Sequence, residues 1–201
     1  GNSYGLTALF TVTNMIEIAG AVLLARRFAP TLNLATVDGA CRFLLSAAVV
    51  APLPAAAITA GALYLINGAD PLEGFQTWWF GHALGIAVIG SFGLSLTRRH
   101  LVALRHPVRA AEAAILLALL VAVCVGAFFQ SQVQIGFVVI PVLILIAARF
   151  RVLGVATALV IVAVAAVGGS MLGMGPFRSA GPGLAEQALL AQLMVLLGCM
   201  P

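Results

Sequence analysis

The sequence predicts an all-α fold, a polytopic bundle of about seven transmembrane helices, and three observations favour it. Of the 201 residues, 63% are hydrophobic and 8% are charged, whereas a typical soluble domain carries roughly 25% charged residues. The apolar residues gather in runs near the roughly 20 residues that a helix needs to cross a bilayer core. The runs are rich in Ala and Leu and lack the alternation of membrane β-strands. A soluble globular domain is therefore excluded.

Seven apolar runs mark the expected helices. They cover residues 6–24, 43–66, 78–96, 110–129, 135–148, 152–172 and 184–199. A kink or break is expected at Pro52 and Pro54, because proline lacks an amide hydrogen. The chain starts at Gly1 rather than Met and ends inside its last apolar run. We therefore expect residues 1–201 to be one integral-membrane domain, a fragment truncated at both ends.

The arginines predict the orientation of the helices. Nine of the ten basic residues lie in the connections after the first, third and fifth runs. Basic loops are retained on the cytoplasmic side, so this side, and with it the C-terminus, is expected to be cytoplasmic. Lipid headgroups explain most of these arginines, and the net charge of +4 therefore does not call for a nucleic-acid partner.

Residues 6–24 contain the one acidic side chain deep within an apolar run. Glu17 precedes Arg26 by nine residues, about 13 Å along a helix, and Asn14 lies on the same helix face. A carboxylate at this depth is costly unless it is paired, so we expect Glu17 to face the bundle interior. Two interpretations stay open: an interhelical hydrogen bond, or a role in responding to a ligand or to protons.

The third run opens with Trp78-Trp79-Phe80-Gly81-His82-Ala83-Leu84-Gly85, expected at the external face. Tryptophans at this level typically anchor a helix at the membrane interface. Gly81 and Gly85 have the spacing that permits close helix packing. His82 is interpreted as a hydrogen-bonded structural residue, with a pH-sensing or metal-binding role as the alternative.

The sixth run ends in a second glycine pattern. Gly169 and Gly173 repeat the close-packing spacing, and Gly175-Pro176 stops the helix before Phe177. Helix packing followed by a tight turn is the favoured interpretation. The alternative is a loop that caps an external ligand pocket.

The opposite, cytoplasmic end carries the charged side chains. We expect Arg26, Arg27, Arg98, Arg99, Glu112 and Arg149 at this interface, with Glu112 paired to Arg149 or Arg109. No HExxH motif occurs, and the three cysteines lie singly. The sequence therefore predicts no catalytic residue, no metal site and no cofactor.

Taken in order, these segments resemble a known family. The matching stretches are Asn14-x-x-Glu17 with Arg26-Arg27, residues 78–85, Glu112, Pro141 through Arg149-Phe150, Gly173-Met174-Gly175-Pro176-Phe177, and Gln192. They resemble the first class of membrane-associated sensor (MASE) domains of bacterial signalling proteins, over almost the whole chain. Each motif is weak, but their order and spacing are fairly specific. The chain departs from the family at His82, where the family has Asp, and at Arg151, where it has Gly.

The resemblance implies a sensory input domain in the bacterial inner membrane, without catalytic activity of its own. It would couple an unknown stimulus to a cytoplasmic output domain, either a two-component histidine kinase or an enzyme of cyclic di-GMP signalling. The implied partners are the lipid bilayer, that output domain and a second copy of the chain. The signal-sensing candidates are Asn14, Glu17, Trp78, Trp79, His82, Gly175, Pro176 and Phe177. A transporter fragment is the alternative function, since proline-broken helices and a buried acid also occur in transporters.

Overall fold

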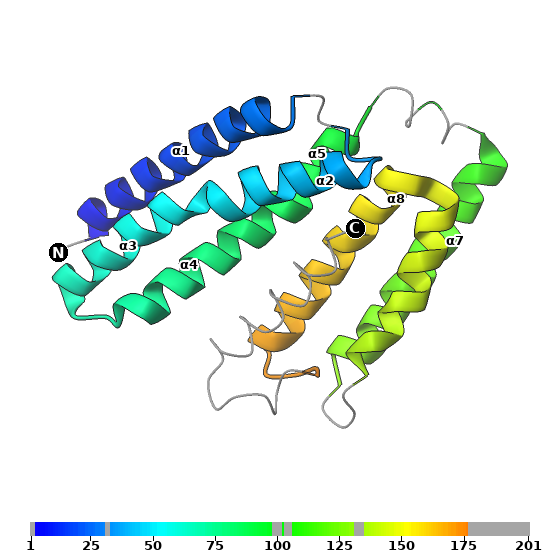
Figure 1. The fold of residues 1–201 in the computed structure, drawn as a ribbon. Helices are drawn as coiled ribbons and strands as arrows, with labels where there is room; N and C mark the ends of the chain where they lie inside the picture. The colour runs from blue at the N-terminus through cyan, green and yellow to red at the C-terminus, as the bar shows by residue number, and fades with distance from the viewer. Residues whose placement is uncertain (1–2, 31–32, 98–101, 103–105, 131–134, 177–201) are drawn as a thin grey trace. The chain divides into compact units, whose positions relative to one another are not determined.

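The computed structural model describes residues 3–30, 33–97, 102, 106–130 and 135–176, and helices joined by turns make up this part of the chain (Figure 1). The longer helices are α1 (Ser3–Phe28), α3 (Pro52–Asn67), α4 (Pro71–Gly85), α7 (Pro107–Phe128) and α8 (Val139–Met171). Shorter ones are α2 (Val37–Phe43), α5 (Ser91–Ser95), the π-helical η1 (Leu44–Val50) and η2 (Ile86–Gly90), and the 3₁₀ turn η3 (Gly136–Val138). The described residues form no strand, which confirms the all-α fold class.

Five helical stretches, rather than about seven, are long and apolar enough to cross a membrane in the described part of the chain. They are Tyr4–Phe28, Val37–Asn67, Pro71–Ser95, Pro107–Phe128 and Gly136–Met171. The predicted count of seven is not confirmed. The expected helices 135–148 and 152–172 are the two arms of α8, which meet at the non-helical backbone of Arg151 and together make one of the five stretches. The expected helix 184–199 lies outside the described residues.

The chain divides into two compact units, one up to Ala87 and the other from Val88 onward, and each is described by itself. In the first unit α3 packs against α1 on one side and α4 on the other (Figure 1). Small residues form these contacts: a Cβ on Gly20 would lie 3.9 Å from Ala51, and one on Gly74 would lie 3.7 Å from Ala60. Close backbone approach at small residues is how membrane helices gain packing energy.

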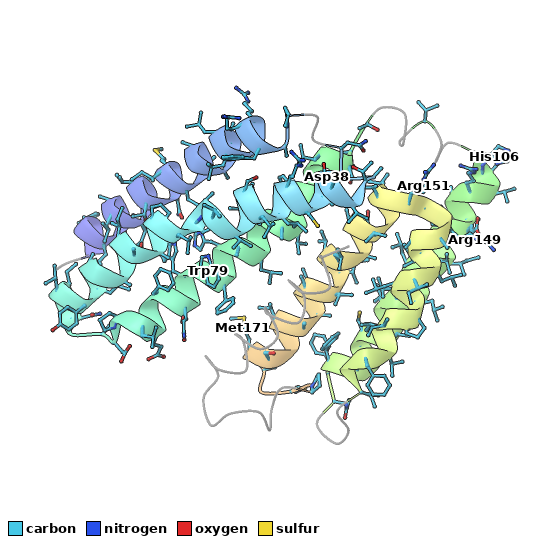
Figure 2. The ribbon with its side chains drawn as sticks, in the orientation of Figure 1. Asp38, Trp79, His106, Arg149, Arg151 and Met171 are labelled. Atoms are coloured by element: carbon cyan, nitrogen blue, oxygen red, sulfur yellow. The ribbon has the colours of Figure 1, made fainter. Side chains whose placement is uncertain are left out.

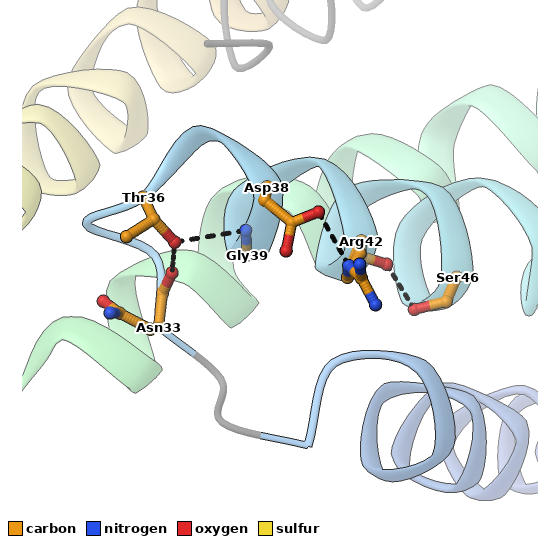
Figure 3. A network of polar contacts seen from close by, with 6 residues as sticks. All are labelled: Asn33, Thr36, Asp38, Gly39, Arg42 and Ser46. Carbon is orange, nitrogen blue, oxygen red and sulfur yellow. Dashed lines mark hydrogen bonds and ion pairs between the residues drawn. The ribbon is translucent and has the colours of Figure 1, made fainter.

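A capped turn joins α1 to α2 at the arginine-rich end of the first unit (Figure 3). The Thr36 hydroxyl accepts a hydrogen bond from the amide of Gly39 at 3.2 Å and donates one to the carbonyl of Asn33 at 3.1 Å. A side-chain acceptor at this position satisfies an amide that the helix itself leaves unpaired. One turn later Arg42 pairs with Asp38 at 2.8 Å.

The second expected helix is interrupted next to its prolines. The π-helical turns of η1 end at Ala51, whose amide donates to the carbonyl of Ser46 at 3.2 Å, and α3 begins directly after it at Pro52. In this i to i+5 register Pro54 would be the donor for the Val49 carbonyl, and proline has no amide hydrogen. The interruption therefore leaves the Val49 carbonyl free to accept a bond from a neighbouring helix.

The third expected helix starts seven residues earlier than its apolar run. Asp70 caps it by accepting hydrogen bonds from the amides of Leu72 and Glu73 at 2.8 and 3.0 Å. Pro71 takes the first helical position, where its missing amide costs nothing. Because the cap lies at Asp70, Trp78 and His82 stand two and three turns inside the helix instead of at its mouth.

In the second unit α7 packs along α8, and α8 bends sharply at Arg151 (Figure 1). Figure 2 shows Arg149 and Arg151 at the same end as His106, which caps α7, while Met171 lies at the other end. Two glycines permit the fold-back. A Cβ on Gly154 would lie 2.3 Å from the Phe150 Cβ, and one on Gly169 would lie 2.3 Å from the Phe128 carbonyl oxygen.

Candidate functional site

The buried acid of the first unit is paired with a histidine. Glu17 on α1 is 4% exposed, and its Oε1 and Oε2 lie 2.9 and 2.8 Å from Nδ1 of His82 on α4. Oε1 has hydrogen-bond geometry to the imidazole. The pair thus joins two helices that are separated by 65 residues, and it places a carboxylate and an imidazole side by side in an apolar bundle.

An aromatic column holds the imidazole in place. The ring of Trp78, one turn before His82, stacks on it with 4.4 Å between centroids and 12° between planes. The ring of Phe10 on α1 packs against the ring of Trp78, with 5.3 Å between the two centroids. Phe10 and Glu17 are seven residues apart, two helical turns, so one face of α1 makes both contacts. The imidazole of His82 is therefore held in its orientation both by stacking on Trp78 and by its hydrogen bond with Glu17.

Trp79 connects α4 to the π-helical segment η1. Its indole nitrogen donates a hydrogen bond to the Val49 carbonyl at 2.9 Å, the acceptor that the π-helical turn and Pro54 leave available. The two tryptophans therefore differ: Trp78 packs on His82 inside the unit, and Trp79 ties α4 to η1. Both are partly buried, so neither is a simple interface anchor.

Three buried polar atoms of the first unit form no hydrogen bond among the described residues: Nε1 of Trp78, Oγ1 of Thr59 and Oε2 of Glu17, which has only the ion-pair contact with Nδ1 of His82. Thr59 is fully buried on α3, next to Ala60, which Gly74 of α4 approaches. An unpaired buried polar atom costs about 1–3 kcal/mol. Such atoms are rare in folded proteins, and each calls for an explanation. The carboxylate of Glu17 and the ring of Trp78 both contact His82, so the carboxylate oxygen and the indole NH are able to bind one small polar molecule.

Access to the site differs between its two titratable groups. The His82 side chain is 30% exposed, whereas that of Glu17 is 5% exposed. A molecule reaching the pair therefore meets the imidazole first. Asn14, on the Glu17 face, is half-buried, and its amide bonds to no described residue. Among the described residues no group of three metal-binding side chains occurs here or elsewhere.

The glycines predicted to pack helices take different places. A Cβ on Gly169 would strike the Phe128 carbonyl oxygen, as described above, whereas a Cβ on Gly85 would meet no atom within 4 Å. Gly173 and Gly175 adopt left-handed backbone conformations, with φ of 66° and 89°. The amide of Gly175 donates to the Gln130 carbonyl at 2.8 Å, so the turn after α8 is tied to the end of α7.

The remaining candidates lie in the second unit or outside the described residues. Glu112 near the start of α7 pairs with Arg149 of α8 rather than with Arg109. Since Arg149 is 58% exposed, this pair contributes little to stability. Gly175 and Pro176 are not in the unit that holds Glu17. Phe177, Arg98 and Arg99 lie outside the described residues.

Sequence reasoning missed three residues of the first unit, namely Phe10, which packs on Trp78, and two buried threonines. Phe10 and Thr59 sit in apolar runs without a motif around them, and Thr13 is fully buried with its hydroxyl bonded to the carbonyls of Leu9 and Phe10. A threonine hydroxyl inside a membrane helix often bonds back to its own helix. The Thr59 hydroxyl does not bond to any described residue, and only the structure distinguishes the two cases.

Comparison with known proteins supplies the family. The family model MASE1 matches residues 1–200, which is nearly the whole chain. The chain belongs to the MASE1 family. MASE1 is a family of membrane sensory domains, so the resemblance drawn from the sequence is confirmed. With five apolar helical stretches in its described part, this MASE1 chain is a multi-pass membrane protein. No curated protein and no solved structure matches it.

Proposed function

We propose that this MASE1 chain is the sensory input domain of a bacterial inner-membrane signalling protein, with a cytoplasmic C-terminus. It acts as one domain and transmits a stimulus to an attached cytoplasmic output domain, a histidine kinase or an enzyme of cyclic di-GMP signalling. The sensing element is the Glu17–His82 pair with Trp78, which stacks on His82. Homodimerisation through the output domain belongs to the same proposal.

The observation that carries the proposal is the buried, incompletely bonded pair. Glu17 is 4% exposed yet one of its oxygens has no hydrogen-bond partner among the described residues. Ionisable groups inside a membrane are expensive, and they usually mark functional sites. A group that served only to fix α1 against α4 would be expected to have all its hydrogen-bonding capacity satisfied.

The pair can act as a two-state contact between helices. A molecule that bonds to Oε2 of Glu17 or to the indole of Trp78 competes with, or strengthens, the Glu17–His82 bond. Because the two residues are on α1 and α4, a change in this bond alters how these helices pack. A stimulus can shift a bundle between two arrangements only if it binds one better than the other. The unpaired polar atoms provide such a difference.

The test compares Glu17→Gln with Glu73→Gln in the full-length protein. Glu17→Gln keeps the side-chain volume but removes the charge beside His82. Glu73 is an exposed acid in the first turn of α4 and serves as the matched control. A hydrogen bond to a charged group contributes about 1.5–3 kcal/mol, so we expect output activity or its response to change about tenfold or more in the first variant only. Unchanged output in Glu17→Gln, at wild-type protein levels, contradicts the proposed sensing site.

A transporter fragment is the competing function, and the interrupted helix at Ala51 is the observation in its favour. Membership of a sensory-domain family favours the sensor. The gene sequence beyond residue 201 separates the two: a kinase or cyclic di-GMP domain supports the sensor, and a further set of membrane spans supports transport.

A further inference from the structure

A cavity of about 340 Å³ lies within the second unit, beside the bend of α8. Its wall is made by α7, by both arms of α8 and by residues around α5. This volume is at the lower end of the range of small-molecule sites. The cavity shares no residue with the Glu17–His82 site, and the inference drawn from it does not rest on the proposed function.

Three arginines line one part of the cavity: Arg109, Arg149 and Arg151. The one acid nearby, Glu112, is bonded to Arg149. Among the described residues no acidic side chain pairs with Arg109 or Arg151. The cavity therefore has positive charge that the described protein does not neutralise.

The rest of the cavity is apolar except for Thr157, whose hydroxyl donates a hydrogen bond to the Leu153 carbonyl of its own helix. Leu116 and Ala113 of α7, and Ile146 and Leu153 of α8, face it. Ile146 is 1% exposed, so the inner wall belongs to the packed interior of the unit. A purely ionic ligand would leave this wall without a partner, and a purely apolar one would leave the arginines without one. An anionic amphiphile meets both requirements.

The backbone at Arg151 adds an independent argument. Its φ of 51° and ψ of −141° lie near a region that only glycine adopts readily. Strained conformations of this kind cluster at active sites and ligand clamps. Arg151 makes no ion pair or hydrogen bond with a described residue, so its side chain does not compensate for the strain within the described protein.

We infer that this cavity binds one anionic phospholipid of the cytoplasmic leaflet. Arg109 and Arg151 contact the headgroup phosphate, and the first part of an acyl chain lies along Leu116 and Ile146. The cavity is at the end of α7 and α8 that carries the arginines, which is where basic residues meet the anionic headgroups of that leaflet. Basic pockets between membrane helices on this side bind anionic headgroups by the same chemistry.

The test is native mass spectrometry of the purified protein in detergent. The lipids are phosphatidylglycerol, phosphatidylcholine and, as a soluble headgroup, glycerol phosphate. We expect one phosphatidylglycerol to be retained in preference to phosphatidylcholine. The apparent affinity should fall about fivefold for each of Arg109→Gln and Arg151→Gln. Arg26→Gln removes an exposed arginine of the first unit and should leave the affinity within about twofold, since screened surface charges act weakly.

Two further variants separate binding from folding. Ala113→Phe fills the cavity while keeping every arginine, and should abolish retention of the lipid. Arg151→Gly relieves the backbone strain, so it should keep or raise the unfolding temperature while lowering the lipid affinity. Equal retention of phosphatidylcholine overturns the charge argument, and binding of glycerol phosphate at the same affinity overturns the acyl-chain argument. Loss of binding in Arg26→Gln as large as in Arg151→Gln overturns the assigned site.

Discussion

The unequal burial of Glu17 and His82 predicts an unequal cost of removing each of them. His82→Leu leaves a carboxylate that is 4% exposed without its partner, and an uncompensated buried charge costs about 3–5 kcal/mol. Glu17→Leu leaves an imidazole whose side chain is 30% exposed, and we expect about 1–2 kcal/mol. The double variant Glu17→Leu/His82→Leu replaces both groups by apolar ones, and such replacements are often nearly neutral.

These three values form a double-mutant cycle with a coupling energy of at least about 2 kcal/mol. Unfolding is followed by far-UV circular dichroism during SDS titration in mixed micelles. The chain has two tryptophans, and both lie at the site, so fluorescence reports the local packing in the same titration. The control cycle uses Asp38 and Arg42, which are also 2.8 Å apart but 73% and 59% exposed, and should give below about 0.5 kcal/mol. If His82→Leu costs no more than Glu17→Leu, the burial argument is refuted.

Two stability predictions follow from backbone geometry. Gly39→Ala should lower the free energy of unfolding by about 1–3 kcal/mol through overpacking, because its Cβ would lie 2.2 Å from the Asn33 carbonyl oxygen. The control Gly61→Ala has no atom within 4 Å of the added Cβ and should raise stability by up to about 1 kcal/mol from helix propensity. Equal effects of the two variants in thermal unfolding would falsify the Gly39 contact. Arg151→Gly should raise the free energy of unfolding by about 1 kcal/mol, because relief of the positive φ outweighs the added chain entropy; a lower unfolding temperature contradicts the strain.

The sequence was sufficient for the fold class and for the helices because both depend on local composition. Apolar runs of membrane length predict helices whatever their neighbours are, and Pro52 marks the interruption that the structure places at Ala51. The two arms of α8 were predictable as well, because residues 135–148 and 152–172 are separated by charged residues. How tightly the chain turns between them was not predictable, and only the contact of Gly154 with Phe150 shows it.

The buried site was half predictable for a related reason. Helical periodicity and the distance to Arg26 place Glu17 on an inward face, and they do so from α1 alone. The partner of Glu17 depends on which helix lies opposite and at what register, and neither is encoded locally. The α4 cap at Asp70 sets that register: starting the helix at Pro71 brings His82 level with Glu17. A helix that began at Trp78, as its apolar run suggests, would leave His82 in its first two turns.

Arg151 is where the resemblance to the family and the structure converge. The resemblance drawn from the sequence implies glycine at this position, and the backbone conformation found here is one that glycine adopts without strain. The bend of α8 thus explains the family's glycine, and it makes the arginine of this chain a departure that costs stability. Local rules are broken most often at functional sites. Since Glu112 and Arg149 already pair with each other, a third arginine at the cavity adds nothing to that contact. The departure is accounted for if Arg151 supplies a charge to a ligand, and the opposite effects expected for Arg151→Gly on stability and on lipid affinity test this point directly.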